Sequence, residues 1–119
     1  MDIQTFYEFC MSLPGTSDGF PFDEDTLVLK VMGKIFAITN VEKFNGINLK
    51  CDPVKAIEYR AEYEEVQPGY HTNKKHWNFV DPRGSLDDEL LFNMIEDSYN
   101  LVAATLPKKL KEELDALSG

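Results

Sequence analysis

The segment from Pro68 to Asn78 (PGYHTNKKHWN) concentrates side chains that can hold an anion or a nucleobase. It contains both histidines of the chain, the single tryptophan and two adjacent lysines. Imidazole, ammonium and carboxamide groups can all donate hydrogen bonds to phosphate oxygens and base edges. The segment also has the composition of a turn leading into a half-buried strand, because Pro-Gly pairs favour turns. The sequence leaves both interpretations open.

A strand over residues 74–80 would place alternate side chains on opposite faces. His76 and Asn78 would then share one face, while Trp77 and Phe79 would share the other with Lys75. We expect the two aromatic side chains to join the core, which leaves the polar groups free for other contacts. The residues of this segment that we predict to bind DNA or another anion are His71, Asn73, Lys74, Lys75, His76 and Asn78.

Two further lysines complete the predicted DNA- or anion-binding set. Lys50 precedes Asp52-Pro53, a pair typical of a helix N-terminus, where free N–H groups and the helix dipole attract anions. Asp52 would itself cap that helix, so helix initiation is the main expectation and an anion contact by Lys50 is the alternative. Lys34 flanks a predicted hairpin turn, where lysines are commonly solvated. A basic stripe would form if Lys30, Lys50 and Lys74 shared one face of the sheet.

The distribution of charge restricts the partners that this surface can have. The formal net charge is −9, which argues against indiscriminate nucleic-acid binding. Residues 1–29 carry six acids and no base, and residues 84–119 carry eight acids and three bases. Residues 30–83 carry nine bases and seven acids. We therefore expect any anion-binding surface to lie in the middle segment.

No sequence pattern indicates catalysis, so we expect a non-enzymatic protein without a cofactor. The chain has no nucleophile elbow, phosphate-binding loop or zinc-protease motif. Cys10 and Cys51 are too few for a disulfide framework and lack the spacing of a metal site, so we expect inert thiols. The acids at Asp18 and residues 23–25 match no calcium loop, and we expect them to keep a loop soluble rather than to bind a metal.

Composition predicts a soluble protein of the cytoplasm. Hydrophobic residues make up 43% of the chain and charged residues 28%, and 119 residues suit one domain, which we place over residues 1–119. No apolar run approaches the roughly 18 residues that span a bilayer, and the N-terminal sequence does not resemble a signal peptide. We expect a monomer that does not contact a membrane.

Hydrophobic periodicity predicts the elements that position these residues. Helices are expected over residues 2–13, 53–63 and 86–105 and from residue 107 onward. Strands are expected over residues 26–32, 34–39, 47–50 and 74–80. Residues 16–25 and 66–69 are expected to be loops, the first anchored by Phe20 and Phe22. This order of elements predicts an α+β sandwich built on a single-domain antiparallel sheet.

Apolar spacing also predicts which side chains face the core. In the helix that follows Asp52-Pro53, the inward residues should be Val54, Ile57 and Ala61. Ser85 and Asp88 have the spacing of a capping box for the next helix. The strand residues predicted to face the core are Leu27, Leu29, Val31, Ile47 and Leu49.

These motifs together resemble the MmcQ/YjbR family of small bacterial proteins. The residues that carry the resemblance are Leu13-Pro14-Gly15, residues 20–25 (FPFDED), 33–37 (GKIFA), 48–53 (NLKCDP), 68–71 (PGYH) and 73–78 (NKKHWN), and Ser98-Tyr99. The resemblance covers nearly the whole chain. It implies a frataxin/CyaY-like fold, with helices packed on one face of the sheet, and a DNA-binding function. The family's recurrent residues correspond to Lys34, Lys50, His71, Lys74, His76 and Asn78 of this chain, and no catalytic residue carries over.

The leading functional hypothesis is therefore non-enzymatic DNA binding by the central surface. Lysines would contact phosphates, while His71, His76 and Asn78 would bond to phosphates or base edges. Two alternatives remain open: a protein-interaction adaptor with a protein partner, and a module that binds a small anion or a nucleotide.

Overall fold

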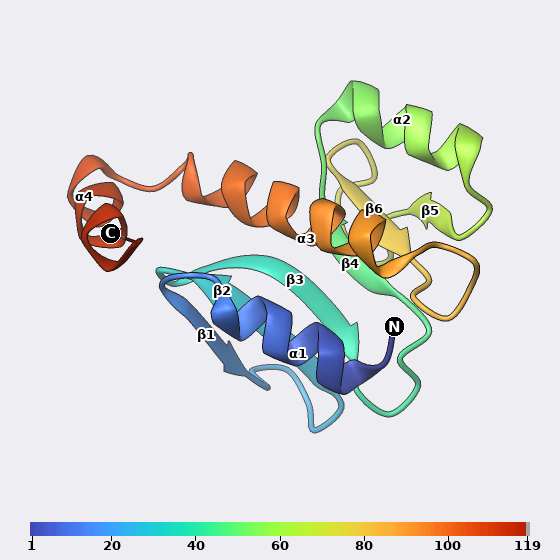
Figure 1. Ribbon diagram of the computed structural model, residues 1–119, viewed down its shortest axis with the longest axis horizontal. Coiled ribbons are helices and arrows are strands. Elements are labelled where there is room, and N and C mark those ends of the chain that lie inside the picture. Colours follow the sequence, from blue (N-terminus) through green and yellow to red (C-terminus); the bar gives the residue numbers. More distant parts are fainter. Residues whose placement is uncertain (119) are drawn as a thin grey trace.

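Helices cover one face of a six-stranded antiparallel sheet in the computed structural model, which describes residues 1–118 (Figure 1). The helices are α1 (Ile3–Ser12), α2 (Pro53–Glu62), α3 (Asp88–Ala103) and α4 (Lys108–Ser118). The strands are β1 (Thr16–Gly19), β2 (Thr26–Val31), β3 (Lys34–Asn40), β4 (Ile47–Lys50), β5 (Val66–Pro68) and β6 (Trp77–Val80). They lie in the order β1-β2-β3-β4-β6-β5. The predicted α+β class is confirmed.

Two rows of paired residues define the two faces of the sheet. Leu29, Ala37, Leu49 and Asn78 form one row, which is buried beneath the helices. The neighbouring row, Val28, Ile38, Asn48 and Phe79, points the other way because strand side chains alternate. Within residues 1–118 no helix packs over this second row, and we call its side of the sheet the open face (Figure 1).

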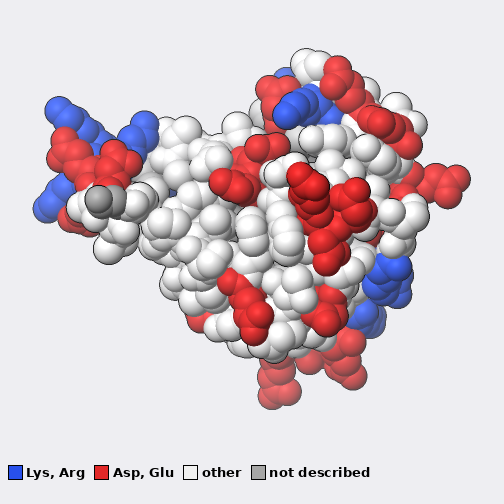
Figure 2. All heavy atoms as spheres, in the orientation of Figure 1, with Lys and Arg blue, Asp and Glu red and all other residues white. Residues whose placement is uncertain are grey.

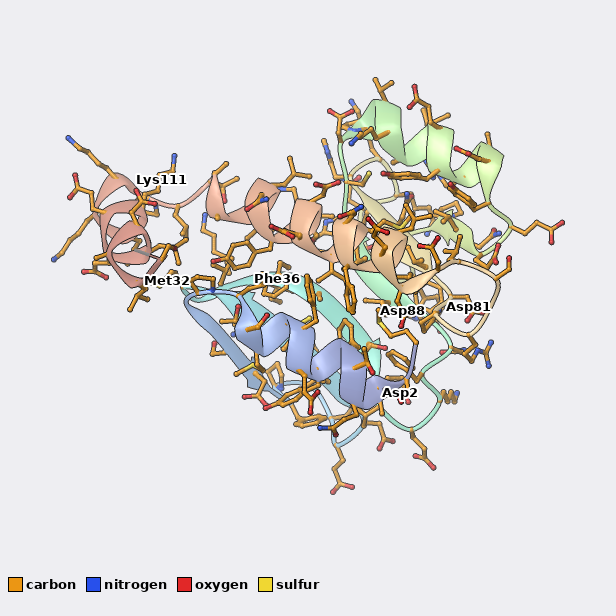
Figure 3. All side chains as sticks on the ribbon, viewed as in Figure 1. Asp2, Met32, Phe36, Asp81, Asp88 and Lys111 are labelled. Atoms are coloured by element: carbon orange, nitrogen blue, oxygen red, sulfur yellow. The ribbon has the colours of Figure 1, made fainter. Side chains whose placement is uncertain are left out.

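The core lies between the sheet and α1 and α3. Phe36 points from β3 toward α3 (Figure 3), and its ring meets Tyr99 edge-to-face with centroids 5.4 Å apart. Ser98, fully buried on α3, donates to the Phe36 carbonyl at 2.6 Å and accepts from the Lys50 N–H at 2.8 Å. One hydroxyl thus fastens α3 to two central strands. The predicted core positions on β2 and β4 are all buried.

Carboxylates cap the first three helices. The Asp2 carboxylate accepts from the Thr5 N–H at 2.8 Å, and Asp52 accepts from the N–H groups of Val54 and Lys55. The Asp52 cap confirms the sequence prediction. The predicted Ser85 cap of α3 is wrong, because Asp87 accepts from the Leu90 N–H at 2.8 Å instead. Ser85 bonds to the Glu65 carboxylate.

Both segments predicted as loops form edge strands. Thr16–Gly19 pairs with β2 as β1, and Val66–Pro68 pairs with β6 as β5. Neither has the apolar alternation that identifies a strand in sequence, since β1 is short and polar and β5 contains a proline, features typical of edges. The predicted anchors Phe20 and Phe22 are 48% and 67% exposed, so they do not anchor the segment.

The inward face of α2 is not the predicted one. Val54 and Ile57 are 65% and 63% exposed and Ala61 is exposed, whereas Ala56 is fully buried. Tyr59, one turn further along, packs against the core together with Tyr63 just beyond the helix. The small alanine allows α2 to approach the sheet closely, and the tyrosine rings supply the apolar contact that the branched residues were expected to make.

The C-terminal helix α4 lies beyond the end of the sheet (Figure 1). Leu114 is buried beside Gly15 and Met32, which lies at the β2–β3 turn on the side of α4 (Figure 3). Leu117 is 63% exposed. Among residues 1–118, no helix is both long enough and apolar enough to cross a bilayer.

Candidate functional site

The loop between β5 and β6 folds back over the open face. The Asn48 side-chain amide donates to the Tyr70 carbonyl at 2.9 Å, and its oxygen accepts from the Tyr70 N–H at 2.9 Å. Since Asn48 belongs to the open-face row and is 5% exposed, this pair of bonds fixes Tyr70 against the sheet. The Tyr70 ring then contacts Phe79, with centroids 5.5 Å apart.

His71 follows in the left-handed region, with φ of 55°. A non-glycine residue pays a conformational cost there, so its surroundings must hold it in place. The neighbouring Asn48 clamp does so, and the His71 ring packs against Tyr70 with centroids 4.1 Å apart. The imidazole remains exposed at the surface.

This loop forms one wall of a cleft of about 510 Å³ on the open face. The floor comes from Ile38, Asn48 and Phe79, and the opposite wall includes Phe22 from the β1–β2 loop. Gly46 makes room for the floor, because a Cβ there would lie 2.0 Å from the Phe79 ring. The full lining is Phe22, Thr26, Ile38, Thr39, Asn40, Lys43, Asn45, Gly46, Asn48, Tyr70, His71, Thr72 and Phe79.

Asp23 holds the β1–β2 loop that carries Phe22. One carboxylate oxygen accepts from the N–H groups of Asp25 and Thr26, at 2.9 and 2.7 Å. The other accepts from the Thr26 hydroxyl at 3.0 Å. The Thr26 hydroxyl bond is the main cause that holds the Asp23 pKa below its ordinary value, with the two backbone bonds adding to it.

Asn78 does not reach the open face, contrary to prediction. It is 2% exposed, pairs with Leu49 in the helix-covered row, and donates to the Ala56 carbonyl at 3.3 Å. Asn78 and its neighbours alternate between the two faces of the sheet as predicted, but each lies on the face opposite to the one expected. The reason is that the Asn78 carboxamide has its hydrogen-bond partner on α2. Trp77 and Phe79 lie instead on the open face, half-buried, and neither belongs to the core cluster.

Three other predicted residues build the turn of the β5–β6 loop. The Asn73 side chain accepts from the Lys75 N–H at 2.9 Å, and the Lys74 ammonium donates to the Gly69 carbonyl at 3.0 Å. The His76 N–H donates to the Asn73 carbonyl at 3.3 Å. The turn interpretation therefore holds for these residues. The Lys75 side chain is exposed and forms no ion pair with any described residue.

The predicted lysines outside this loop have separate places. The Lys34 ammonium donates to the carbonyl and hydroxyl of Thr105, at 3.2 and 3.3 Å, beyond the end of α3. It does not line the cleft. Lys50 pairs with Trp77, and strand alternation puts both Lys50 and Lys30 on the open side of the sheet. Lys74 is occupied in its turn, so the basic stripe contains two of the three expected lysines.

The helix-covered side of the molecule disfavours an anionic ligand. On the helix-covered side, Asp and Glu side chains gather over the middle of the molecule, and Lys and Arg lie toward its margins (Figure 2). The first turn of α3 alone carries Asp88 and Glu89. An anionic ligand is repelled from that side. The open face offers His71, Lys43 and the two lysines of the stripe.

His71 is the only predicted site residue among those that line the cleft. The lining side chains best suited to contact a ligand that sequence reasoning missed are Phe22, Lys43, Asn45 and Tyr70. The sequence contains features that could have indicated some of these residues. The Phe20-Pro21-Phe22 run places two aromatic rings in a short loop. Tyr70 is adjacent to His71 in sequence, so it could have been added to the predicted binding residues together with His71. The contribution of Lys43 depends on how the β3–β4 turn folds over the sheet, which local sequence does not determine.

Side chains able to ligate a metal are dispersed over residues 1–118. No three His, Cys, Asp or Glu side chains lie close enough to hold a metal ion in that part of the chain. Burial raises the pKa of the Cys10 thiol to about 12. Burial also raises the pKa of Cys51, although less, and Lys55 opposes it. Both thiols are therefore protonated at neutral pH.

Comparison with known proteins places the fold and its loops in one family. The sequence profile of the YjbR family matches residues 11–101, which include every segment that lines the cleft. The chain belongs to the YjbR family. It is 38% identical to protein YbdF of Escherichia coli O157:H7 over 114 residues, covering 92% of this chain and 93% of YbdF. It is 30% identical to YjbR of Escherichia coli K12 over 115 residues, covering 96% and 98%.

Solved structures support the same relationship. The crystal structure of Deinococcus radiodurans protein DR2400 matches with a TM-score of 0.87 and 35% identity, covering 96% of this chain and 88% of that one. A crystal structure of a Pseudomonas syringae protein matches with a TM-score of 0.75 and 26% identity, covering 86% and 99%. YbdF and YjbR are both described as uncharacterized, so membership of the YjbR family establishes the fold and leaves the activity to be argued from the site.

Proposed function

We propose that this YjbR-family protein is a non-enzymatic DNA-binding protein that uses the open face of its sheet. The observation that carries the proposal is the cleft of about 510 Å³ on the open face, whose lining joins the aromatic side chains of Phe22 and Tyr70 to Lys43 and His71. Phosphate groups would meet Lys43 and Lys75, while His71 stands beside them. Lys75 and His71 belong to the set predicted from sequence, and Lys43 is added to it. The predicted residues Lys34, Lys74 and Asn78 make their hydrogen bonds elsewhere in the fold.

The acidic remainder of the molecule supports selective rather than indiscriminate binding. With a net charge of −9, long-range attraction to DNA is absent, so affinity must come from the local arrangement. A binding surface restricted to one face agrees with this requirement, because the acidic helices then lie away from the phosphate backbone.

Fluorescence anisotropy of labelled oligonucleotides, single-stranded and duplex, tests the proposal at about 50 mM salt. The test variant is Lys43→Glu with Lys75→Glu. Its control is Lys108→Glu with Lys109→Glu on α4, which changes the net charge equally but beyond the end of the sheet (Figure 1). We expect the test variant to lose at least about tenfold in affinity and the control to stay within about twofold. Equal losses, or no binding of either DNA by the native protein, would refute the proposal.

One observation favours a second candidate, a protein-interaction adaptor. Val54 and Ile57 present an apolar stripe on the outer side of α2, at 65% and 63% exposure. Purification of the protein with one stoichiometric partner, lost on Val54→Lys with Ile57→Lys, would favour this candidate. Retention of DNA binding by the same variant would assign the two activities to different surfaces.

A further inference from the structure

We infer that the cleft on the open face receives an unstacked nucleobase, so that the preferred ligand is single-stranded DNA. The inference rests on the proposed function and adds to it the form of the DNA and the place of one base. Its geometric basis is that Phe22 and Tyr70 stand at the two walls of the cleft, with their rings 67% and 59% exposed.

The Tyr70 wall is fixed before any ligand arrives, and so is the backbone that follows Phe22. Tyr70 is held through its backbone by the two Asn48 bonds and through its ring by Phe79. Phe22 lies one residue before Asp23, whose carboxylate accepts three bonds within the same loop. A ring ordered in advance, as that of Tyr70 is, loses little conformational freedom on binding, which favours stacking.

The polar groups of the cleft suit a base joined to a phosphate. In the described part of the chain, the side chains of Lys43, Asn45 and His71 have no hydrogen-bond partner, although all three line the cleft. The Asn45 carboxamide both donates and accepts, as a base edge requires, and the Lys43 ammonium suits a phosphate oxygen. The cleft volume lies in the range of pockets that enclose small ligands.

A duplex does not fit this arrangement. The faces of its bases are stacked on each other, so aromatic rings cannot reach them, whereas every base of a single strand offers a free π-face. Direct readout of a duplex commonly places a helix or a two-stranded ribbon in the major groove. Here α1, α2 and α3 lie on the opposite side of the sheet (Figure 1), and the first turn of α3 is acidic.

The test compares four fluorescent ligands of matched label: a short single strand, its duplex, an abasic strand of the same length, and a mononucleotide. The proteins are the native chain, Phe22→Ala, Tyr70→Ala and a control, Phe20→Ala. Phe20 lies in the same loop as Phe22 and is 48% exposed but does not line the cleft. Thermal unfolding verifies that each variant is folded.

We expect the native protein to bind the single strand at least about tenfold more tightly than the duplex, the abasic strand or the mononucleotide. Tyr70→Ala and Phe22→Ala should each weaken binding of the single strand about tenfold, without changing binding of the abasic strand. Phe20→Ala should bind like the native protein.

Three results would overturn the inference. If the duplex bound as tightly as the single strand and Tyr70→Ala did not weaken that binding, the protein would still be a DNA-binding protein. The claim that its cleft receives a nucleobase would be refuted. Mononucleotide binding as tight as that of the strand would make the ligand a free nucleotide. Absence of binding to every DNA would remove the proposed function together with this inference.

Discussion

Asn48 connects the fold of the YjbR-family chain to the shape of its cleft. Its carboxamide donates to the carbonyl and accepts from the N–H of a single residue, Tyr70, and so determines where the following loop crosses the open face. The same bonds support the left-handed backbone of His71. A buried amide on the outer face of a strand is thus a structural residue that positions the candidate binding residues.

Replacing Asn48 by alanine should therefore loosen the loop and lower stability. The substitution leaves the part-buried N–H and carbonyl of Tyr70 without their partners, which costs about 1–3 kcal/mol. Urea unfolding measures this loss, and hydrogen exchange should show faster exchange at the Tyr70 amide. Asn93→Ala, at an exposed position of α3, is the matched control and should leave both quantities unchanged. Unaltered exchange at Tyr70 in Asn48→Ala would contradict the positioning role.

At the scale of elements, the turn before β4 determines whether the floor of the cleft can form. Gly46 lies against the ring of Phe79, so Gly46→Ala must displace a rigid aromatic group. We expect a loss of about 1–3 kcal/mol, typical of overpacking. Gly19→Ala is the control, because no atom lies within 4 Å of its Cβ position and its φ is not positive. Comparable losses at the two glycines in urea unfolding would count against a tight Gly46–Phe79 contact.

The orientation of α2 supplies a second test at this scale. Ile57→Lys, on the exposed stripe, should change stability by less than about 0.5 kcal/mol. Ala56→Leu, at a fully buried position, should lower it by about 1–3 kcal/mol because α2 cannot move away from β6 without breaking the Asn78 bond. If Ile57→Lys lowered the urea midpoint more than Ala56→Leu does, the data would instead support the orientation of α2 that was predicted from sequence, with Ile57 facing inward.

These elements also show which features of the fold can be predicted from local sequence. Strong local signals, such as the Asp52-Pro53 helix start and the β-branched run of β2, predicted their elements to within a residue or two. The exchanged faces of β6 and α2 arose because alternation gives two faces without saying which one is buried. That choice is made by tertiary partners: Ala56 for Asn78, and the tyrosine rings for α2. The cleft joins four segments distant in sequence, so no local pattern could predict it.

At the scale of the whole molecule, hydrogen-bonded carboxylates make stability depend on pH. Hydrogen bonds from Thr5, Thr26, Ser85 and Arg83 lower the pKa values of Asp2, Asp23, Glu65 and Asp81, respectively. Because the folded values are lowered, the stabilisation is complete above the ordinary values, 4.5 for Glu65 and 3.8 for the aspartates. It is lost as pH falls through the lowered values.

Thermal unfolding followed from neutral pH downward should therefore show a melting temperature that is nearly constant near neutrality and falls below about pH 4. Asp23→Asn should reduce the size of that fall, since it removes one of the titrating carboxylates. A melting temperature that rises on acidification would mean that relief of repulsion in this acidic chain outweighs the lost hydrogen bonds.

DNA binding should depend on salt in proportion to the lysines of the open face. If Lys30, Lys43, Lys50 and Lys75 each contact one phosphate of a single strand, the plot of log affinity against log salt concentration should have a slope of about −2.8. Anisotropy titrations over a range of salt concentrations give the slope, and Lys75→Glu should make it shallower by about 0.7. A slope near zero would indicate that phosphates are not contacted.

The most direct test of the central claim is titration of isotope-labelled protein with a short single strand at about 50 mM salt, following every backbone amide by NMR. The account predicts shifts at Phe22, Lys43–Gly46 and Tyr70–Thr72, with little change along α1 and α4, and reversal by added salt. Shifts confined to the helix-covered side, or none at millimolar DNA, would contradict the assignment of DNA binding to the open face.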